Sequence, residues 1–323
     1  MPNIHKLSVY VIFVYAQFDK NTLIKAKIFS DWWCHFLEKS SVAKRKKDAI
    51  RNKYGIAGNG DDIRDYTDEQ FFKVYRYILE ADTPIGSNIR GLKMADVGLY
   101  FLLNLISREV KDQKCARIML GDSETIKNNI MDIMGKKSKD TRSSQYIRES
   151  FKRLADLSLI KADIVSEKKF DVYKNIKIPY THDKYTKNGF FMFYIVDISK
   201  FMDKIKESNI ELSIREFLEL LGVYTVSFLT FYSEKSTSYL GNGVVTLDYT
   251  MPTKYANRID FTFGLKLTGG IRKKGMKEYL DMLEELGLVV SMPIDYEGNR
   301  SHLYTFLKNV SQFFKIIDDI YGE

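Results

Sequence analysis

The stretches FKRLADLSLIKADI at residues 151–164 and LDMLEELGLVVSMPI at residues 280–294 share one apolar frame. When Phe151 is aligned with Leu280, five apolar positions coincide: Phe151, Leu154, Leu157, Leu159 and Ile160 match Leu280, Leu283, Leu286, Leu288 and Val289. Spacings of three and four residues are typical of one helix face, and a short apolar run after them favours a strand. We therefore expect each stretch to be a helix that turns directly into a strand.

Similar patterns surround both stretches. Around the first, they predict a core helix at 92–110, a strand at 116–120, a helix capped by Asp122 or Ser123, a polar turn at 135–144, a helix at 145–157, and strands at 159–165 and 189–198. Around the second, they predict helices at 213–235 and 271–288, a strand at 244–248, and a ribbon around the turn EGNR at 297–300. Helix, strand, helix, turn, helix and ribbon is the order of a winged helix-turn-helix. Because the order recurs, we predict an α+β protein with two tandem winged helix-turn-helix units.

The sequence indicates three regions. Residues 91–208 are the predicted first winged-helix domain and residues 209–323 the second. Residues 1–90 form an additional N-terminal α/β region, with a strand in VYVIFVYAQF at 9–18, a helix at 23–37 and a short amphipathic helix at 68–79. A dimerisation element and an accessory DNA contact both remain open as roles for this region.

The composition favours an anionic partner. The 323 residues include 50 Lys and Arg against 42 Asp and Glu, a formal charge of +8. The two cysteines, Cys34 and Cys115, form no CxxC pair, which argues against a disulfide framework and a structural zinc. Apolar runs are too short to span a bilayer, so we expect a cytoplasmic protein without membrane contact.

Catalytic motifs are not evident. The four histidines, at positions 5, 35, 182 and 302, do not have metal-ligand spacing, and the chain lacks a phosphate-binding loop of the GxxxxGK[ST] type. We therefore expect a protein that is not an enzyme and that uses neither cofactor nor metal.

The tandem arrangement, over residues from about 92 to 310, resembles the replication initiator proteins of plasmids. In that family, related winged-helix units bind successive turns of iterated repeats near an origin. The resemblance is one of architecture and includes no family-specific binding motif. It implies double-stranded DNA as the partner, with host replication proteins as further partners and a homodimer left open.

The expected DNA-binding residues of the first unit surround its late helix. Lys and Arg provide affinity through phosphates, while side chains in the major groove provide specificity. Gln145 and Arg148 can each bind a base edge through two hydrogen bonds, so they are the expected base readers. Other candidates are Lys136, Lys137, Lys139, Arg142, Ser144 and Lys152, with Lys168 and Lys169 in the wing.

The second unit has Arg272, Lys273, Lys274 and Lys277 at the corresponding place, and Arg300 at its turn. Basic residues at a helix start are unfavourable in an isolated helix, which suggests an external anion there. A solvated helix face is the alternative for either cluster. A further basic run includes Lys44, Arg45, Lys46 and Lys47; a contact with the DNA backbone, a disordered arm and a solvated face are all compatible with it.

Two other functions are compatible with these patterns. A transcriptional regulator or partition protein would use the same units on a palindrome. A protein-interaction scaffold would bind DNA weakly and with little dependence on salt.

Overall fold

A computed structural model describes residues 41–56, 71–75, 92–112, 115–135, 140–179, 190–207, 211–231, 243–259 and 273–322, together with Gly58 and Gly241. They belong to two compact units. One contains the described residues up to 58 and those from 314 onward, and the other contains those from 59 to 313. The strand predicted at 9–18 and the helix predicted at 23–37 lie outside the described residues. None of the described helices is long and apolar enough to cross a membrane.

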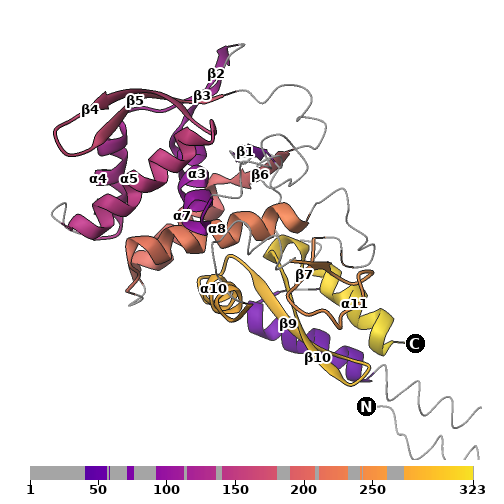
Figure 1. The fold of residues 1–323 in the computed structure, drawn as a ribbon. Coiled ribbons are helices and arrows are strands. Elements are labelled where there is room, and N and C mark those ends of the chain that lie inside the picture. Colours follow the sequence, from indigo (N-terminus) through magenta and orange to yellow (C-terminus); the bar gives the residue numbers. More distant parts are fainter. Residues whose placement is uncertain are drawn as a thin grey trace, which may run out of the picture. The chain divides into compact units, whose positions relative to one another are not determined.

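The larger unit mixes helices with mostly antiparallel strands, which confirms the α+β class (Figure 1). Its first half contains α3 (Met94–Ile106), β2 (Arg108–Asp112), β3 (Cys115–Ile118), α4 (Ser123–Ile133), α5 (Thr141–Asp156), β4 (Lys161–Ser166) and β5 (Asp171–Pro179). The strands form a sheet in the order β2-β3-β5-β4. Strand β3, before the helix pair, thus binds the last strand, β5, and β5 binds the strand that follows the helices directly.

The second half contains α8 (Ile214–Phe231), β7 (Val245–Thr246), β8 (Asn257–Arg258), α10 (Lys273–Glu285), β9 (Val290–Tyr296) and β10 (Asn299–Thr305). Its sheet order is β8-β7-β10-β9. The order β7-β10-β9 matches the order β3-β5-β4: in each sheet the last strand pairs both with the strand before the late helix and with the strand after it. Glu297 and Gly298 both have positive φ at the turn between β9 and β10, as a two-residue hairpin turn with right-handed strand twist requires.

The two copies agree at the level of single hydrogen bonds. In the alignment that sets Phe151 on Leu280, α5 and α10 end at the same position, and β4 and β9 begin at the same position. The backbone N–H groups of Leu159 and Ile160 both donate to the carbonyl oxygen of Leu154, at 2.9 and 3.3 Å. The same two bonds, at the same distances, join the aligned residues of the second copy: Leu288 and Val289 to Leu283.

The end of the helix is also the same in both copies. Ser158 has a φ of 57°, and Gly287, at the aligned position, has a φ of 75°. A residue in this left-handed region commonly ends a helix by turning the chain out of its axis. The predicted passage from helix to strand therefore has one local geometry in both places.

The helix predicted at 68–79 and the placement of the strand predicted at 189–198 in the first ribbon were wrong. Residues 71–75, expected within a helix, form strand β1 (Phe71–Tyr75), and 190–194 form its antiparallel partner β6 (Phe190–Tyr194) in a separate sheet. Phe72 and Val74 are buried while Phe71 is exposed, so the apolar pattern has the period of a strand. The strand that pairs with β4 is β5 and not the one predicted at 189–198; its buried Val172, Ile176 and Ile178 are interspersed with lysines, which give the segment the composition of a polar loop.

Further elements follow the sheets. Helix α7 (Ile195–Glu207) begins directly after β6, and a short 3-10 helix, η4 (Leu307–Asn309), leads to helix α11 (Ser311–Tyr321). Residues 41–54 are helical and carry the basic run.

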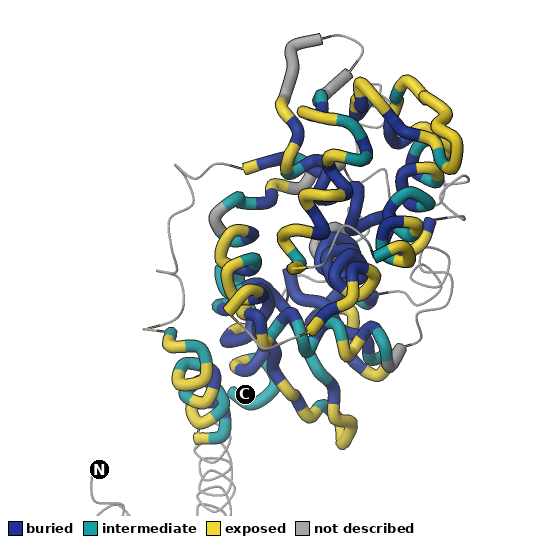
Figure 2. The backbone as a smooth tube through the Cα atoms, turned by 90° about the vertical axis from the view of Figure 1, so that its left-hand side faces the viewer, coloured by how far each residue is buried: buried dark blue, intermediate teal, exposed yellow. Residues whose placement is uncertain are grey.

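Helices α3 and α8, the opening helices of the two halves, cross at two glycines. A Cβ atom on Gly98 would overlap the carbonyl oxygen of Leu218, and one on Gly222 would overlap the carbonyl oxygen of Met94. The Cβ of residue 98 would also lie 3.0 Å from the backbone nitrogen of Gly222. Figure 2 shows that the buried residues of this unit lie in its interior. The residues of α8 from Phe217 to Ser227 are all buried.

We expect Gly98→Ala to lower the free energy of unfolding by about 1–3 kcal/mol, because the added methyl group would overlap backbone atoms of α8. A backbone, unlike a side chain, cannot avoid the overlap by changing rotamer, so the two helices must move apart. Urea denaturation of the full chain measures this. Gly135→Asn is the control, since Gly135 has open space around it and a positive φ that asparagine tolerates. Equal losses for both variants would contradict a close crossing.

Candidate nucleic-acid interface

Helix α5 presents one face to the core and the other to solvent. Its N-cap Asp140 accepts hydrogen bonds from the backbone N–H of Ser143 at 3.1 Å and from its hydroxyl at 2.7 Å. Ile147, Phe151 and Leu154 are fully buried and anchor the inner face. The helix thus begins four residues earlier than the sequence predicts, because Asp140 caps it within the expected turn.

We define the α5 stripe as the outward residues Arg142, Gln145, Glu149 and Lys152. Arg142, Gln145 and Lys152 are exposed, and Glu149 is half-buried. The Gln145 side-chain amide donates to Glu149 over 3.0 Å. An exposed pair of this kind contributes little to stability, so a base edge can compete for the amide. The stripe therefore combines two cations with one amide suited to a base edge.

Ser144 was predicted to face DNA, and this is wrong. Its side chain is only 5% exposed, and its hydroxyl lies 3.5 Å from the sulfur of Met131 in α4. The reason is helical periodicity, because Ser144 lies three residues before Ile147 on the inner face.

The guanidinium of Arg148 is bound by neighbouring side chains of the protein. Its Nε and Nη2 atoms donate to the two carboxylate oxygens of Glu124, each over 2.7 Å. Its guanidinium also lies 3.5 Å from the ring centroid of Phe170, in the hairpin between β4 and β5. The hydrogen bonds from Arg148 lower the pKa of Glu124, whereas the burial of the Glu124 carboxylate opposes that shift. Arg148 is therefore bound to residues of α4 and the hairpin, whereas the exposed Gln145 binds Glu149 of its own helix.

The β4–β5 hairpin carries exposed lysines beyond the helices. Lys168 and Lys169 are exposed in its connection, and Lys174 and Lys177 are exposed along β5. Ser123 at the start of α4 accepts a 3.0 Å hydrogen bond from the backbone N–H of Tyr173, three residues after the connection, which ties this end of β5 to the helices. The lysines of the connection are thus exposed on a hairpin that is anchored close to its tip.

A buried ion pair fixes α5 on α3, and sequence reasoning missed it. Arg153 donates to both carboxylate oxygens of the fully buried Asp96, at 2.7 and 2.9 Å. Asp96 also accepts from the backbone N–H of Lys93 at 2.8 Å, as a capping box requires. A single acid within the apolar run MADVGLYFLLNLI was the available signal for a buried partner.

The corresponding helix of the second half is held by different chemistry. Tyr279 of α10 donates to Glu219 of α8 over 2.5 Å, and Arg215 donates to the same carboxylate over 2.8 Å. Burial, followed by the hydrogen bond to Glu219, raises the pKa of Tyr279. Both opening helices thus carry one acid that a residue of the late helix binds.

The predicted cations of the second half are only partly described. Lys277 is exposed and forms an ion pair with Asp281 one turn later, and Arg300 is exposed next to the β9–β10 turn. Helix α10 begins at Lys273, but the side chains of Lys273 and Lys274 lie outside the described set, as do Arg272 and the predicted cations Lys136, Lys137 and Lys139.

The basic run at 44–53 is divided between solvent and the C-terminal helix. Lys44 and Arg45 are exposed on the helix. Lys47 forms an ion pair with Asp318, and the ammonium of Lys46 lies 4.7 Å from the ring centroid of Tyr321. Lys46 and Lys47, two of the four cations predicted to contact DNA, therefore contact α11. The other two, Lys44 and Arg45, face solvent.

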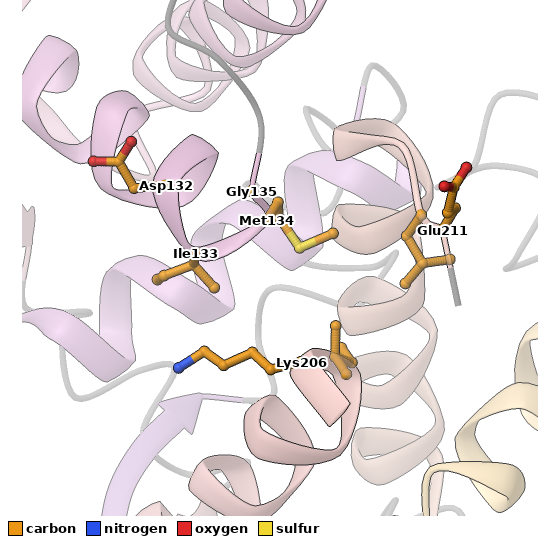
Figure 3. A pocket seen from close by; sticks show the side chains of 8 residues that line it. Asp132, Ile133, Met134, Gly135, Lys206 and Glu211 are labelled. Carbon is orange, nitrogen blue, oxygen red and sulfur yellow. The ribbon is translucent and has the colours of Figure 1, made fainter. Parts of the chain in front are cut away.

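A pocket of about 740 Å³ lies between the end of α4 and the residues around the end of α7 (Figure 3). Its lining includes Lys206 against the acids Asp132 and Glu211, a charge balance that does not favour a polyanion. Within the described part of the chain, no three His, Cys, Asp or Glu side chains converge as metal ligands.

The Glu124–Arg148 pair predicts a pH dependence of stability. Because the pKa of Glu124 is below its ordinary value of 4.5 in the folded state, the unfolded chain binds this proton more readily. The stabilisation is therefore present above pH 4.5 and is lost as the pH falls below it. We expect urea unfolding between about pH 6 and pH 3.5 to show a smaller loss for Glu124→Gln than for the wild type. Equal losses would contradict the pairing.

Comparison of the chain with protein-family models, curated proteins and solved structures finds no match.

Proposed function

We propose that residues 92–179 and 214–305 are two winged-helix units that bind double-stranded DNA, and that the protein initiates replication of a plasmid or similar mobile element by binding repeats at its origin. In this proposal it acts in the cytoplasm, performs no catalysis and recruits host replication proteins. The N-terminal region would serve as an accessory contact or in a homodimer.

The repeated connection between helix and strand supports this proposal most directly. In both halves an opening helix precedes a strand, a late helix and a hairpin, and the strand pairing follows one rule. The hydrogen bonds and left-handed residue that end α5 recur at the aligned positions at the end of α10. A late helix followed by a hairpin supports the proposal, because winged-helix proteins place such a helix in the major groove.

The chemistry of the α5 stripe suits duplex DNA. Gln145 can bind adenine through two hydrogen bonds, and Arg142 can do the same with guanine. Lys152, Lys168 and Lys169 add exposed positive charge for phosphates. Protein–protein interfaces are instead depleted in lysine relative to the rest of a protein surface.

Selection of bound fragments from the protein's own replicon or genome, followed by footprinting at two salt concentrations, tests the proposal. Protection of iterated repeats beside A·T-rich DNA supports the initiator. One protected palindrome would instead indicate a transcriptional regulator or partition protein. No selective binding at either salt concentration would overturn DNA binding and favour a protein-interaction scaffold.

We expect Gln145→Ala to weaken binding to the selected site by about 1–3 kcal/mol and to change binding to random duplex little, because the amide reads a base. Gln312→Ala in α11 removes the same group elsewhere and is the control. Fluorescence anisotropy on both duplexes measures the difference. Equal weakening on both duplexes would show that Gln145 contacts only the backbone.

Replacing Lys273 and Lys274 together by glutamine should reduce the salt dependence of binding by up to about two phosphate equivalents, because each lysine releases one condensed counterion. The slope of log affinity against log salt concentration measures this. An unchanged slope would remove the start of α10 from the interface.

A further inference from the structure

Arg148 lies where three elements meet. It is part of α5, its two hydrogen bonds go to Glu124 in the first turn of α4, and its planar face covers Phe170 in the β4–β5 hairpin. Lys127 also binds Glu124, over 2.6 Å, so the carboxylate is surrounded by cations. A guanidinium can provide a bidentate fork and a stacking face together, whereas an ammonium group cannot.

The position of Arg148 along α5 brings the hairpin next to the α5 stripe. Gln145 precedes it by three residues and Lys152 follows it by four, so all three lie on neighbouring turns of one helix side. Phe170 covers the guanidinium between them, and Lys168 and Lys169 come immediately before Phe170 in the chain. The contact therefore holds the exposed hairpin lysines beside the outward side of α5.

The second half has no equivalent of this contact at the same helix position. Lys277 aligns with Arg148 but forms its ion pair within α10, with Asp281. Its hairpin is closed by the two-residue turn at Glu297 and Gly298, and β9 and β10 pair along their whole length. The β4–β5 hairpin has a longer connection, residues 167–170, which is closed by a 2.9 Å hydrogen bond from the backbone N–H of Glu167 to the carbonyl oxygen of Phe170. Arg148 adds a contact from outside the hairpin.

We propose that Arg148 is a positioning residue: it clamps the β4–β5 hairpin against α4 and α5 so that Lys168 and Lys169 meet DNA phosphates beside the groove that α5 enters. The DNA part of this role rests on the function proposed above. Base reading then belongs to Gln145 and Arg142, and the expectation that Arg148 reads a base is replaced by one in which it supports the residues around it.

Hydrogen exchange without DNA tests the clamp itself. Arg148→Lys keeps the charge but removes the fork and the stacking face, and Phe170→Leu keeps an apolar side chain but removes the ring. In both variants we expect exchange at the amides of residues 166–171 to accelerate by about tenfold or more, while β9 and β10 stay unchanged. Lys277→Arg is the matched control at the same position of the second half. Unchanged exchange in Arg148→Lys would overturn the clamp.

Binding to duplex DNA tests the purpose of the clamp. We expect Arg148→Lys to weaken binding to the selected site and to random duplex alike, and to lower the salt slope by about two phosphate equivalents, as replacing Lys168 and Lys169 by glutamine does. Combining all three changes should add no further loss of slope. Loss on the selected site alone, with an unchanged slope, would make Arg148 a base reader and overturn the proposal.

The two experiments separate this proposal from the proposed function. A wild-type chain that binds no duplex would overturn DNA binding and the role of the lysines, while the exchange rates would still decide whether Arg148 clamps the hairpin. Full binding and slope in Arg148→Lys would show that only its charge matters and would overturn the positioning role.

Discussion

The crossing of α3 and α8 is the contact on which the larger unit depends. Each helix brings a glycine against a carbonyl oxygen of the other, and each of those oxygens belongs to the residue four positions before the opposite glycine: Met94 before Gly98, and Leu218 before Gly222. The contact is therefore reciprocal. Because backbone meets backbone, its geometry depends little on side-chain rotamers.

The two late helices of the proposed interface are attached to this crossing by buried polar pairs. Arg153 ties α5 to α3 through Asp96, and Tyr279 ties α10 to α8 through Glu219. Tyr146 of α5 lies within electrostatic reach of both acids, and burial raises its pKa to about 12. A buried carboxylate without its partner is costly, so each pair selects one position of the late helix on its opening helix.

The sequence predicted the repeated frame well because five apolar positions per copy constrain the same helix-to-strand geometry. It also predicted the start of α4, where Asp122 accepts from Thr125 over 2.8 Å as an N-cap does. It did not predict the pairing of β1 with β6, since strands so far apart in the chain leave no local signal.

Within the candidate site, the prediction of exposure was right for Gln145 and Lys152 and wrong for Ser144, and the partners of the charged residues were not predicted. Gln145 and Lys152 are outward, as helical periodicity indicates, whereas Ser144 is inward for the same reason. That Arg148 binds Glu124 could not be read from the chain, because 24 residues separate them and any of several acids could serve. The same limit applies to Lys47, whose partner Asp318 lies 271 residues away.

The separation of Lys47 from Asp318 along the chain affects how the protein folds during its synthesis. Helix 41–54 leaves the ribosome long before the residues that bind Lys46, Lys47 and Arg51 have been made. At about 5–20 residues per second, the delay is roughly 15–50 seconds. During that time its cationic side chains have none of their α11 partners, so the smaller unit assembles late, and a nascent chain exposes more positive charge to cellular polyanions than the finished protein does.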